Sequence, residues 1–138
     1  MTNAKKYLNR FSRNIGILSF NEQEKLSNVT VGIAGLGGLG GQTFINLVRM
    51  GVGKFNIADI DTFDIANTNR QIGATESSLG KSKVSVMSAM AKDINPDVQI
   101  TEFPTGIQKN TVDEFVKLSD IIVDSLDFFC LTPRQLLY

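Results

Sequence analysis

The segment VGIAGLGGLGGQTF, from Val31 to Phe44, decides the fold: an apolar run of β-branched residues meets four glycines within six residues, and a helix-like pattern follows. Gly35, Gly37 and Gly40 fit the pattern GxGxxG between a predicted strand and a predicted helix. The first glycine would make the tight turn, the second would let a phosphate approach the backbone, and the third would let the helix pack close to the strand. With Gly38, they predict a phosphate-binding turn at the start of a helix. A glycine-rich turn that binds nothing is the alternative.

Strand-like and helix-like segments alternate along the chain around this turn. Strands are predicted over 29–35, 54–61, 97–104 and 120–127, and helices over 38–51, 80–94, 110–119 and from 132 onward. Such alternation implies right-handed βαβ units. We therefore expect an α/β, Rossmann-like domain over 29–138, with a mostly parallel sheet and helices on both faces. Because the last predicted helix stops in mid-pattern at residue 138, we expect this domain to be incomplete at its C-terminus, after the fourth strand.

Short N-terminal helices are predicted over 3–13 and 21–28, which together form an N-terminal helical arm over 1–28. Asn21, Asn110 and Thr132 are the predicted N-caps of the helices that follow them. The fourth strand, DIIVDSLD, is apolar enough to predict burial on both faces.

Composition excludes several classes of function. The chain has 14 Lys plus Arg and 14 Asp plus Glu, so no overall field favours nucleic acid or an anionic membrane. With no His and one Cys, it has no His-based catalysis and can form no internal disulfide, and zinc is not supported by these residues. We interpret Cys130 as a small buried side chain rather than a nucleophile. No apolar run approaches ~18 residues and no signal peptide opens the chain, so a cytoplasmic protein is expected.

Acidic residues end the second predicted strand, in the sequence IADID. The carboxylate of Asp59 can accept two hydrogen bonds from ribose hydroxyls, which suits NAD and ATP equally. Asp61 could be a second contact, a helix cap or a solvated side chain, and the last two interpretations are preferred.

The sequence IANTNRQIG, residues 65–73, favours ATP over NAD as the ligand. It places Asn67 and Arg70 on a loop over the crevice at the glycine turn. The planar guanidinium of Arg70, with its five N–H donors, suits phosphate oxygens. Lys83, near the start of the next helix, opposes the helix dipole unless an anion lies close by; a solvated lysine is the alternative. Asp124 and Asp127 end the fourth strand, where a carboxylate can hold a magnesium ion that bridges phosphates. A dehydrogenase would leave Arg70, Lys83 and Asp127 without a role.

The run RFSRNI…GLGGLGG…ADIDTFDIANTNRQ…GKSKV…DINP…IIVDSLD, which extends from about residue 10 to residue 127, resembles the ThiF/MoeB/HesA family. These adenylating enzymes are related to the ubiquitin-activating enzymes. The resemblance implies an adenylyltransferase that uses ATP and Mg²⁺. A carboxylate attacks the α-phosphorus of ATP and pyrophosphate leaves. The implied substrate is the C-terminus of a ubiquitin-like sulfur-carrier protein, or a peptide.

The resemblance also implies roles by matching position. Asp59 would bind ribose, Asn67 would orient the nucleotide, and Arg70 would grip the phosphates. Lys83 would contact the α-phosphate region and Asp127 would hold magnesium.

Arg13, in FSRNI, matches an arginine that in the family reaches into the partner subunit's ATP site, which implies a homodimer or a pseudo-dimer. The sequence departs from the family at Phe128, where an Asn is frequent, and it lacks the zinc-binding Cys-x-x-Cys pairs and the later catalytic Cys of many members.

Three alternatives stay open. A tRNA-modifying member of the same family would adenylate a carboxylate on a modified base. The balanced charge gives this alternative no support, but the basic N-terminal helix leaves nucleic acid open as a partner. An NAD(P)-dependent oxidoreductase and a non-catalytic subunit that scaffolds an active partner are the others.

Overall fold

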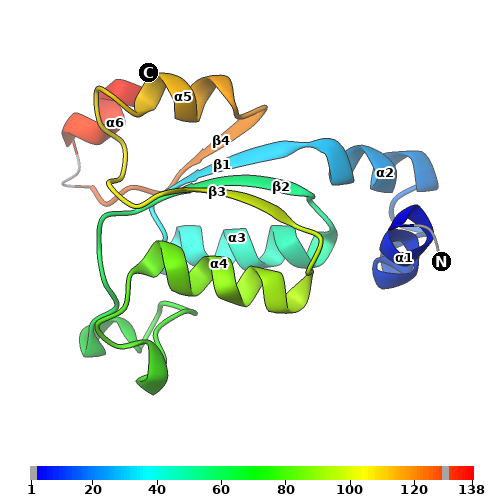
Figure 1. Ribbon diagram of the computed structural model, residues 1–138, viewed down its shortest axis with the longest axis horizontal. Coiled ribbons are helices and arrows are strands. Elements are labelled where there is room, and N and C mark those ends of the chain that lie inside the picture. Colours follow the sequence, from blue (N-terminus) through cyan, green and yellow to red (C-terminus); the bar gives the residue numbers. More distant parts are fainter. Residues whose placement is uncertain (1–2, 129–130) are drawn as a thin grey trace.

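A computed structural model describes residues 3–128 and 131–138 of the chain (Figure 1). Within them, a single parallel sheet has the strand order β3-β2-β1-β4. The strands are β1 (Thr30–Ala34), β2 (Lys54–Ala58), β3 (Gln99–Phe103) and β4 (Ile121–Asp124). The predicted α/β fold with a parallel sheet is confirmed.

Helices cover both faces of the sheet, as predicted. The longer helices α3 (Gly38–Met50) and α4 (Lys83–Ile94) lie on one face, and α5 (Val112–Lys117) and α6 (Leu131–Leu137) lie on the other (Figure 1). In the strand register, Ala34 pairs with both Ala58 and Asp124. The carboxyl ends of the strands therefore meet at one edge of the sheet. The strand order reverses beside β1, which is where open α/β sheets form their ligand crevice.

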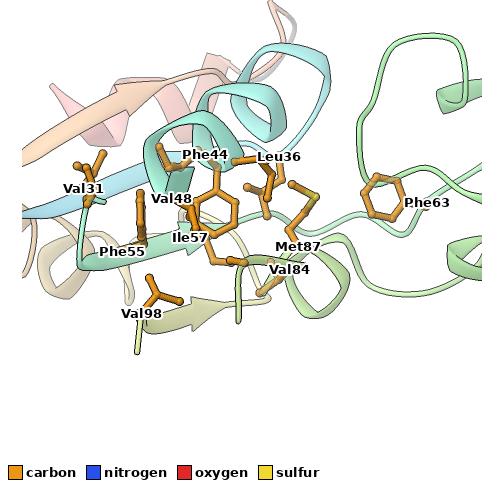
Figure 2. Packing of buried hydrophobic residues seen from close by; sticks show 14 of the residues in the cluster. Val31, Leu36, Phe44, Val48, Phe55, Ile57, Phe63, Val84, Met87 and Val98 are labelled. Carbon is orange, nitrogen blue, oxygen red and sulfur yellow. The ribbon is translucent and has the colours of Figure 1, made fainter. Parts of the chain in front are cut away.

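Aromatic pairs hold the helices to both faces of the sheet. Under α3 and α4, the ring of Phe44 meets the ring of Phe55 edge-on, with centroids 4.8 Å apart (Figure 2). On the opposite face, Phe103 and Phe115 pack in the same way at 5.3 Å. Such pairs add to the free energy gained by burying apolar surface. The carboxyl edge of the sheet is thus built on a close-packed platform.

The N-terminal segment contains α1 (Asn3–Arg10), a 3₁₀ turn (Ser12–Asn14) and α2 (Phe20–Asn28). It packs against the C-terminal end of α3, where the last backbone carbonyls of a helix lack partners of their own. The Tyr7 hydroxyl donates to the Gly51 carbonyl at 2.6 Å, and Asn14 Nδ2 donates to the Met50 carbonyl at 2.9 Å. The division of the chain at residues 28 and 29 stays a prediction.

The predicted N-caps are wrong. The N-cap of α2 is Ser19, whose hydroxyl accepts from the Glu22 N–H, while the Glu22 carboxylate accepts from the Ser19 N–H at 2.7 Å. This reciprocal capping box starts the helix before Asn21. The N-cap of α5 is Thr111, because a tight turn over residues 108–111 delays the helix past Asn110. Helix α6 begins at Leu131, which places Thr132 inside it.

Strand β4 is not buried on both faces. Within residues 3–128 and 131–138 it pairs with β1 alone, and Ile121 is 58% exposed. An apolar sequence shows that a strand can be buried, but the strand order decides whether it is. Cys130, predicted as a buried side chain, lies outside the described residues. No helix in the described part of the chain has both the length and the apolar character needed to cross a membrane.

Candidate functional site

A pocket of about 520 Å³ opens at the carboxyl edge of the sheet. Small-molecule sites are commonly this large. Most of the residues that were predicted to form a binding site line it, although they come from five separate segments of the chain: Gly35, Gly37, Gly38, Asp59, Arg70, Lys83 and Asp127. The structure thus brings these residues together, and their individual roles stay predictions.

The glycine turn joins β1 to α3. Gly35 has a φ of +91°, which side chains disfavour, and its N–H donates to the Ala58 carbonyl at 2.8 Å. Gly40 lies behind the turn and does not line the pocket. A Cβ there would lie 1.9 Å from the Gly35 carbonyl oxygen, so the third glycine permits close packing of the helix. Gly37 is the N-cap of α3 and has no side chain to bond the first-turn amides, which can serve an anion.

Asp59 ties the glycine turn to the end of β2. One carboxylate oxygen accepts from the Leu36 N–H at 2.6 Å and the other accepts from the Asp61 N–H at 2.9 Å. Since each carboxylate oxygen has two lone pairs, both can still accept a hydrogen bond from a ligand hydroxyl.

Lys83 is the first residue of α4 and is 5% exposed. Its ammonium lies 3.2 Å from Asp61 Oδ2 and 6.0 Å from the ring centre of Phe63. Asp61 is therefore the anion that a lysine at this end of a helix requires. The interpretation of Asp61 as merely solvated is wrong, since its carboxylate holds this buried ammonium at the wall of the pocket.

The loop that follows β2 uses its two predicted residues differently. The side-chain oxygen of Asn67 accepts from the Asp64 N–H at 2.8 Å, so this side chain caps its own 3₁₀ turn and does not line the pocket. Arg70 lines the pocket and is exposed; its Nη1 donates to the Ala66 carbonyl and to Asn69 Oδ1, at 3.1 and 2.9 Å. These bonds use one of its three nitrogens, and the guanidinium has five donors in all.

Asp127 is an exposed residue of the pocket wall whose Oδ1 accepts from the Phe128 N–H at 2.7 Å. Across the part of the chain that the structure describes, no three Asp, Glu, Cys or His side chains gather as a metal site. A single carboxylate nevertheless suits Mg²⁺, which takes most of its other ligands from phosphates and water.

Arg134 is a residue of the site region that the sequence analysis missed. Its Nε donates to Asp124 Oδ2 at 2.8 Å, and its Nη2 donates to the Leu126 carbonyl. Burial raises the pKa of the Asp124 carboxyl, but the hydrogen bonds from Arg134 and the Leu126 N–H, with the Arg134 charge, outweigh it and hold the pKa below its usual value. The ion pair thereby ties α6 to the end of β4.

We expect Arg134→Gln to lower the free energy of unfolding by about 1–3 kcal/mol at neutral pH, and by less in acid. Because the pKa of Asp124 is lowered in the folded state, the stabilisation is complete above the unfolded-state pKa of about 3.9 and is lost as the pH falls through the folded-state pKa. Urea unfolding of both proteins from pH 7 downward measures this. A loss of equal size at every pH would contradict the role given to the charge.

Arg13 lies far from the pocket of its own chain. It is exposed in the 3₁₀ turn Ser12–Asn14, next to the asparagine that bonds the last turn of α3. The pocket is at the other end of that 13-residue helix, which is about 20 Å long. The structure therefore does not bring Arg13 to the other predicted residues.

Comparisons with known proteins show which family the chain belongs to. The family model described as "ThiF family" matches residues 11–137. A tRNA threonylcarbamoyladenosine dehydratase of Bacillus subtilis is 36% identical over 124 residues, which are 89% of this chain and 49% of that protein. A probable molybdopterin-synthase adenylyltransferase of Porphyra purpurea is 34% identical, with 87% of this chain and 32% of that protein covered.

Among solved structures, a crystal structure of Escherichia coli MccB with ATP superimposes with a TM-score of 0.71 at 29% identity. The match covers 86% of this chain and 37% of that one. The chain thus spans about half the length of these relatives, or less.

Proposed function

Because the chain belongs to the ThiF family, we propose that it binds ATP in the pocket at the glycine turn and adenylates a carboxylate. The observation that carries the proposal is the convergence of the glycine turn, Asp59, Arg70, Lys83 and Asp127 on one pocket. The solved relative in complex with ATP and the relative named as an adenylyltransferase support it.

In the proposed reaction, the substrate carboxylate attacks the α-phosphorus of ATP, and pyrophosphate leaves. The carboxylate is already a nucleophile, so the absence of His from the chain is no obstacle. The protein has to gather negative charge and stabilise more of it on the leaving group. Arg70, Lys83 and the amides at the start of α3 supply donors for this purpose. One such donor contributes roughly 3–4 kcal/mol to the transition state.

Asp59 binds the ribose hydroxyls in this proposal, and Asn67 orients the nucleotide through the loop that its side chain caps. Asp127 holds Mg²⁺, which would neutralise phosphate charge when bound. A cytoplasmic location stays a prediction.

The proposed substrate is the C-terminal carboxylate of a ubiquitin-like sulfur carrier, or of a peptide. The tRNA-modifying branch is a second candidate, favoured by the 36% identity to a tRNA-modifying relative. Exchange of labelled pyrophosphate into ATP tests the proposal and separates the candidates. Exchange that depends on a carrier protein or peptide supports the first substrate, and exchange that depends on modified tRNA supports the second. Absence of exchange with every carboxylate favours the scaffold alternative.

We further propose a homodimer in which Arg13 acts on the partner's pocket. Its distance from its own pocket supports this arrangement. Arg13→Ala and Arg70→Ala homodimers are each expected to lack exchange. In a mixed dimer one of the two pockets keeps both arginines, so each mixed dimer should have about half of the wild-type activity. Because random mixing makes about half of the dimers mixed, the whole sample should regain about a quarter. Mixing the two variants after dissociation measures this. No recovery in mixed dimers would contradict a shared site.

A further inference from the structure

Gln71 is a polar residue of the pocket that the proposed reaction does not use. It is 7% exposed, it lines the pocket, and its Oε1 is buried without a hydrogen-bond partner among the described residues. Its backbone is held on both sides: the Gln71 N–H donates to the Asn67 carbonyl and the Gln71 carbonyl accepts from the Ala74 N–H, each at 2.9 Å. The side chain is therefore held at the pocket by the fold of the loop.

The Gln71 amide also lies beside the glycine turn. Its Nε2 is 3.8 Å from the position that a Cβ would take on Gly37, the N-cap of α3. An anion held by the first-turn amides of α3 would therefore lie close to this donor.

A buried amide oxygen that accepts no hydrogen bond destabilises a fold, since it has lost its hydrogen bonds to water. A protein that needed only to fill this space would be more stable with an apolar side chain. Unsatisfied polar groups persist where a ligand supplies the missing bonds. The buried Oε1 of Gln71 needs a donor, and the Nε2 of the same amide can donate to an acceptor beside Gly37. A hydrated phosphate group offers both, because its oxygens accept and the waters around it donate.

We propose that Gln71 is a ligand-contacting residue whose side-chain amide binds the phosphate end of the nucleotide beside the glycine turn. This inference rests on the proposed binding of ATP. The Gln71 amide would give the pocket a neutral donor and acceptor in addition to the charges of Arg70 and Lys83. This role also explains why an amide is buried at the wall of the pocket.

Gln71→Leu separates this role from a structural one, because the two roles predict opposite outcomes. If the amide serves the ligand, the variant melts at the same temperature as the wild type or higher, while its affinity for ATP falls about tenfold. If the amide serves the fold, the melting temperature falls and the affinity is kept. Thermal melting without ligand and calorimetric titration with magnesium–ATP measure the two quantities.

Ser88→Ala is the matched control. Ser88 is 2% exposed and does not line the pocket. Among the described residues, its Oγ is the other buried side-chain oxygen that has no hydrogen-bond partner. This variant should keep both its melting temperature and its ATP affinity.

Gln71→Glu tests the location of the contact. It preserves the shape of the side chain but replaces the amide donor with a negative charge. It should therefore lower the affinity for ATP and for inorganic triphosphate more than Gln71→Leu does. Unchanged affinity in both variants would overturn the inference while leaving the proposed function intact. Failure of the wild-type chain to bind either probe would instead overturn the binding of ATP itself, and this inference with it.

Discussion

Gly40→Ala is expected to destabilise the fold by about 3 kcal/mol and to abolish ATP binding. The new methyl group would lie 1.9 Å from the Gly35 carbonyl oxygen and 2.2 Å from Ser125 Oγ. Neither atom can yield easily, because Ser125 Oγ bonds the Ala34 and Gly35 carbonyls, each at 2.8 Å. Helix α3 would have to move away from β1, and the turn that faces the pocket would open.

Urea unfolding and calorimetric titration with ATP measure the two effects. Gly38→Ala is the stability control, because the nearest atoms to its Cβ, the Arg70 Cγ and the Arg70 carbonyl oxygen, would each be 3.4 Å away, an ordinary contact distance. It should unfold like the wild type. A Gly40→Ala protein that unfolds like the wild type and still binds ATP would show that the close contact between α3 and the turn is not needed.

Arg70→Ala is expected to reduce ATP–pyrophosphate exchange by at least about a hundredfold and to leave the fold intact. The loss would come from removing a charged donor from the place where the leaving group gains negative charge. The fold should tolerate the change because Arg70 is exposed and, among the described residues, its side chain bonds only to Ala66 and Asn69 of its own loop.

Exchange rates and circular dichroism check the two halves of this prediction. Arg49→Ala is the matched control, since Arg49 is an exposed arginine in the last turn of α3, at the end remote from the pocket. The exchange rate of Arg70→Lys should lie between those of Arg70→Ala and Arg49→Ala, because lysine retains the charge but lacks the planar guanidinium. Exchange retained in Arg70→Ala would remove this residue from the mechanism.

The sequence predicted the architecture well because the sheet is made by local patterns. The four strands, the helices between them and the glycine turn follow from alternation and from Gly35, Gly37 and Gly40. The boundaries were predicted less well. The N-cap of α2 is Ser19 because it bonds reciprocally with Glu22, and nearby polar residues such as Asn21 could equally have been the cap. The exposure of β4 depends on the strand order.

Four of the charged residues proposed for the site, Asp59, Arg70, Lys83 and Asp127, line one pocket, Arg13 does not, and the roles of all five stay predictions. The sequence did not predict how the charged side chains pair. Lys83 at the start of α4 called for an anion, yet only the fold shows that Asp61, 22 residues earlier, supplies it. The side chain of Asn67 caps its own 3₁₀ turn, which the sequence did not predict, and its role in orienting the nucleotide stays a prediction. Gln71 and Arg134 were missed because their importance depends on their surroundings. The Gln71 amide oxygen is buried at the pocket wall without a partner among the described residues, and Arg134 on α6 meets the carboxylate of Asp124. Such relations join distant residues and leave no periodic trace in a sequence.

The central claim is that the glycine turn and its pocket hold ATP. Calorimetric titration of the purified chain with magnesium–ATP and, separately, with NADH tests it most directly, because Asp59 and the glycines would suit either ligand whereas Arg70, Lys83 and Asp127 suit a triphosphate. The account predicts binding of ATP and no binding of NADH. Binding of NADH without binding of ATP would contradict it and would favour an oxidoreductase.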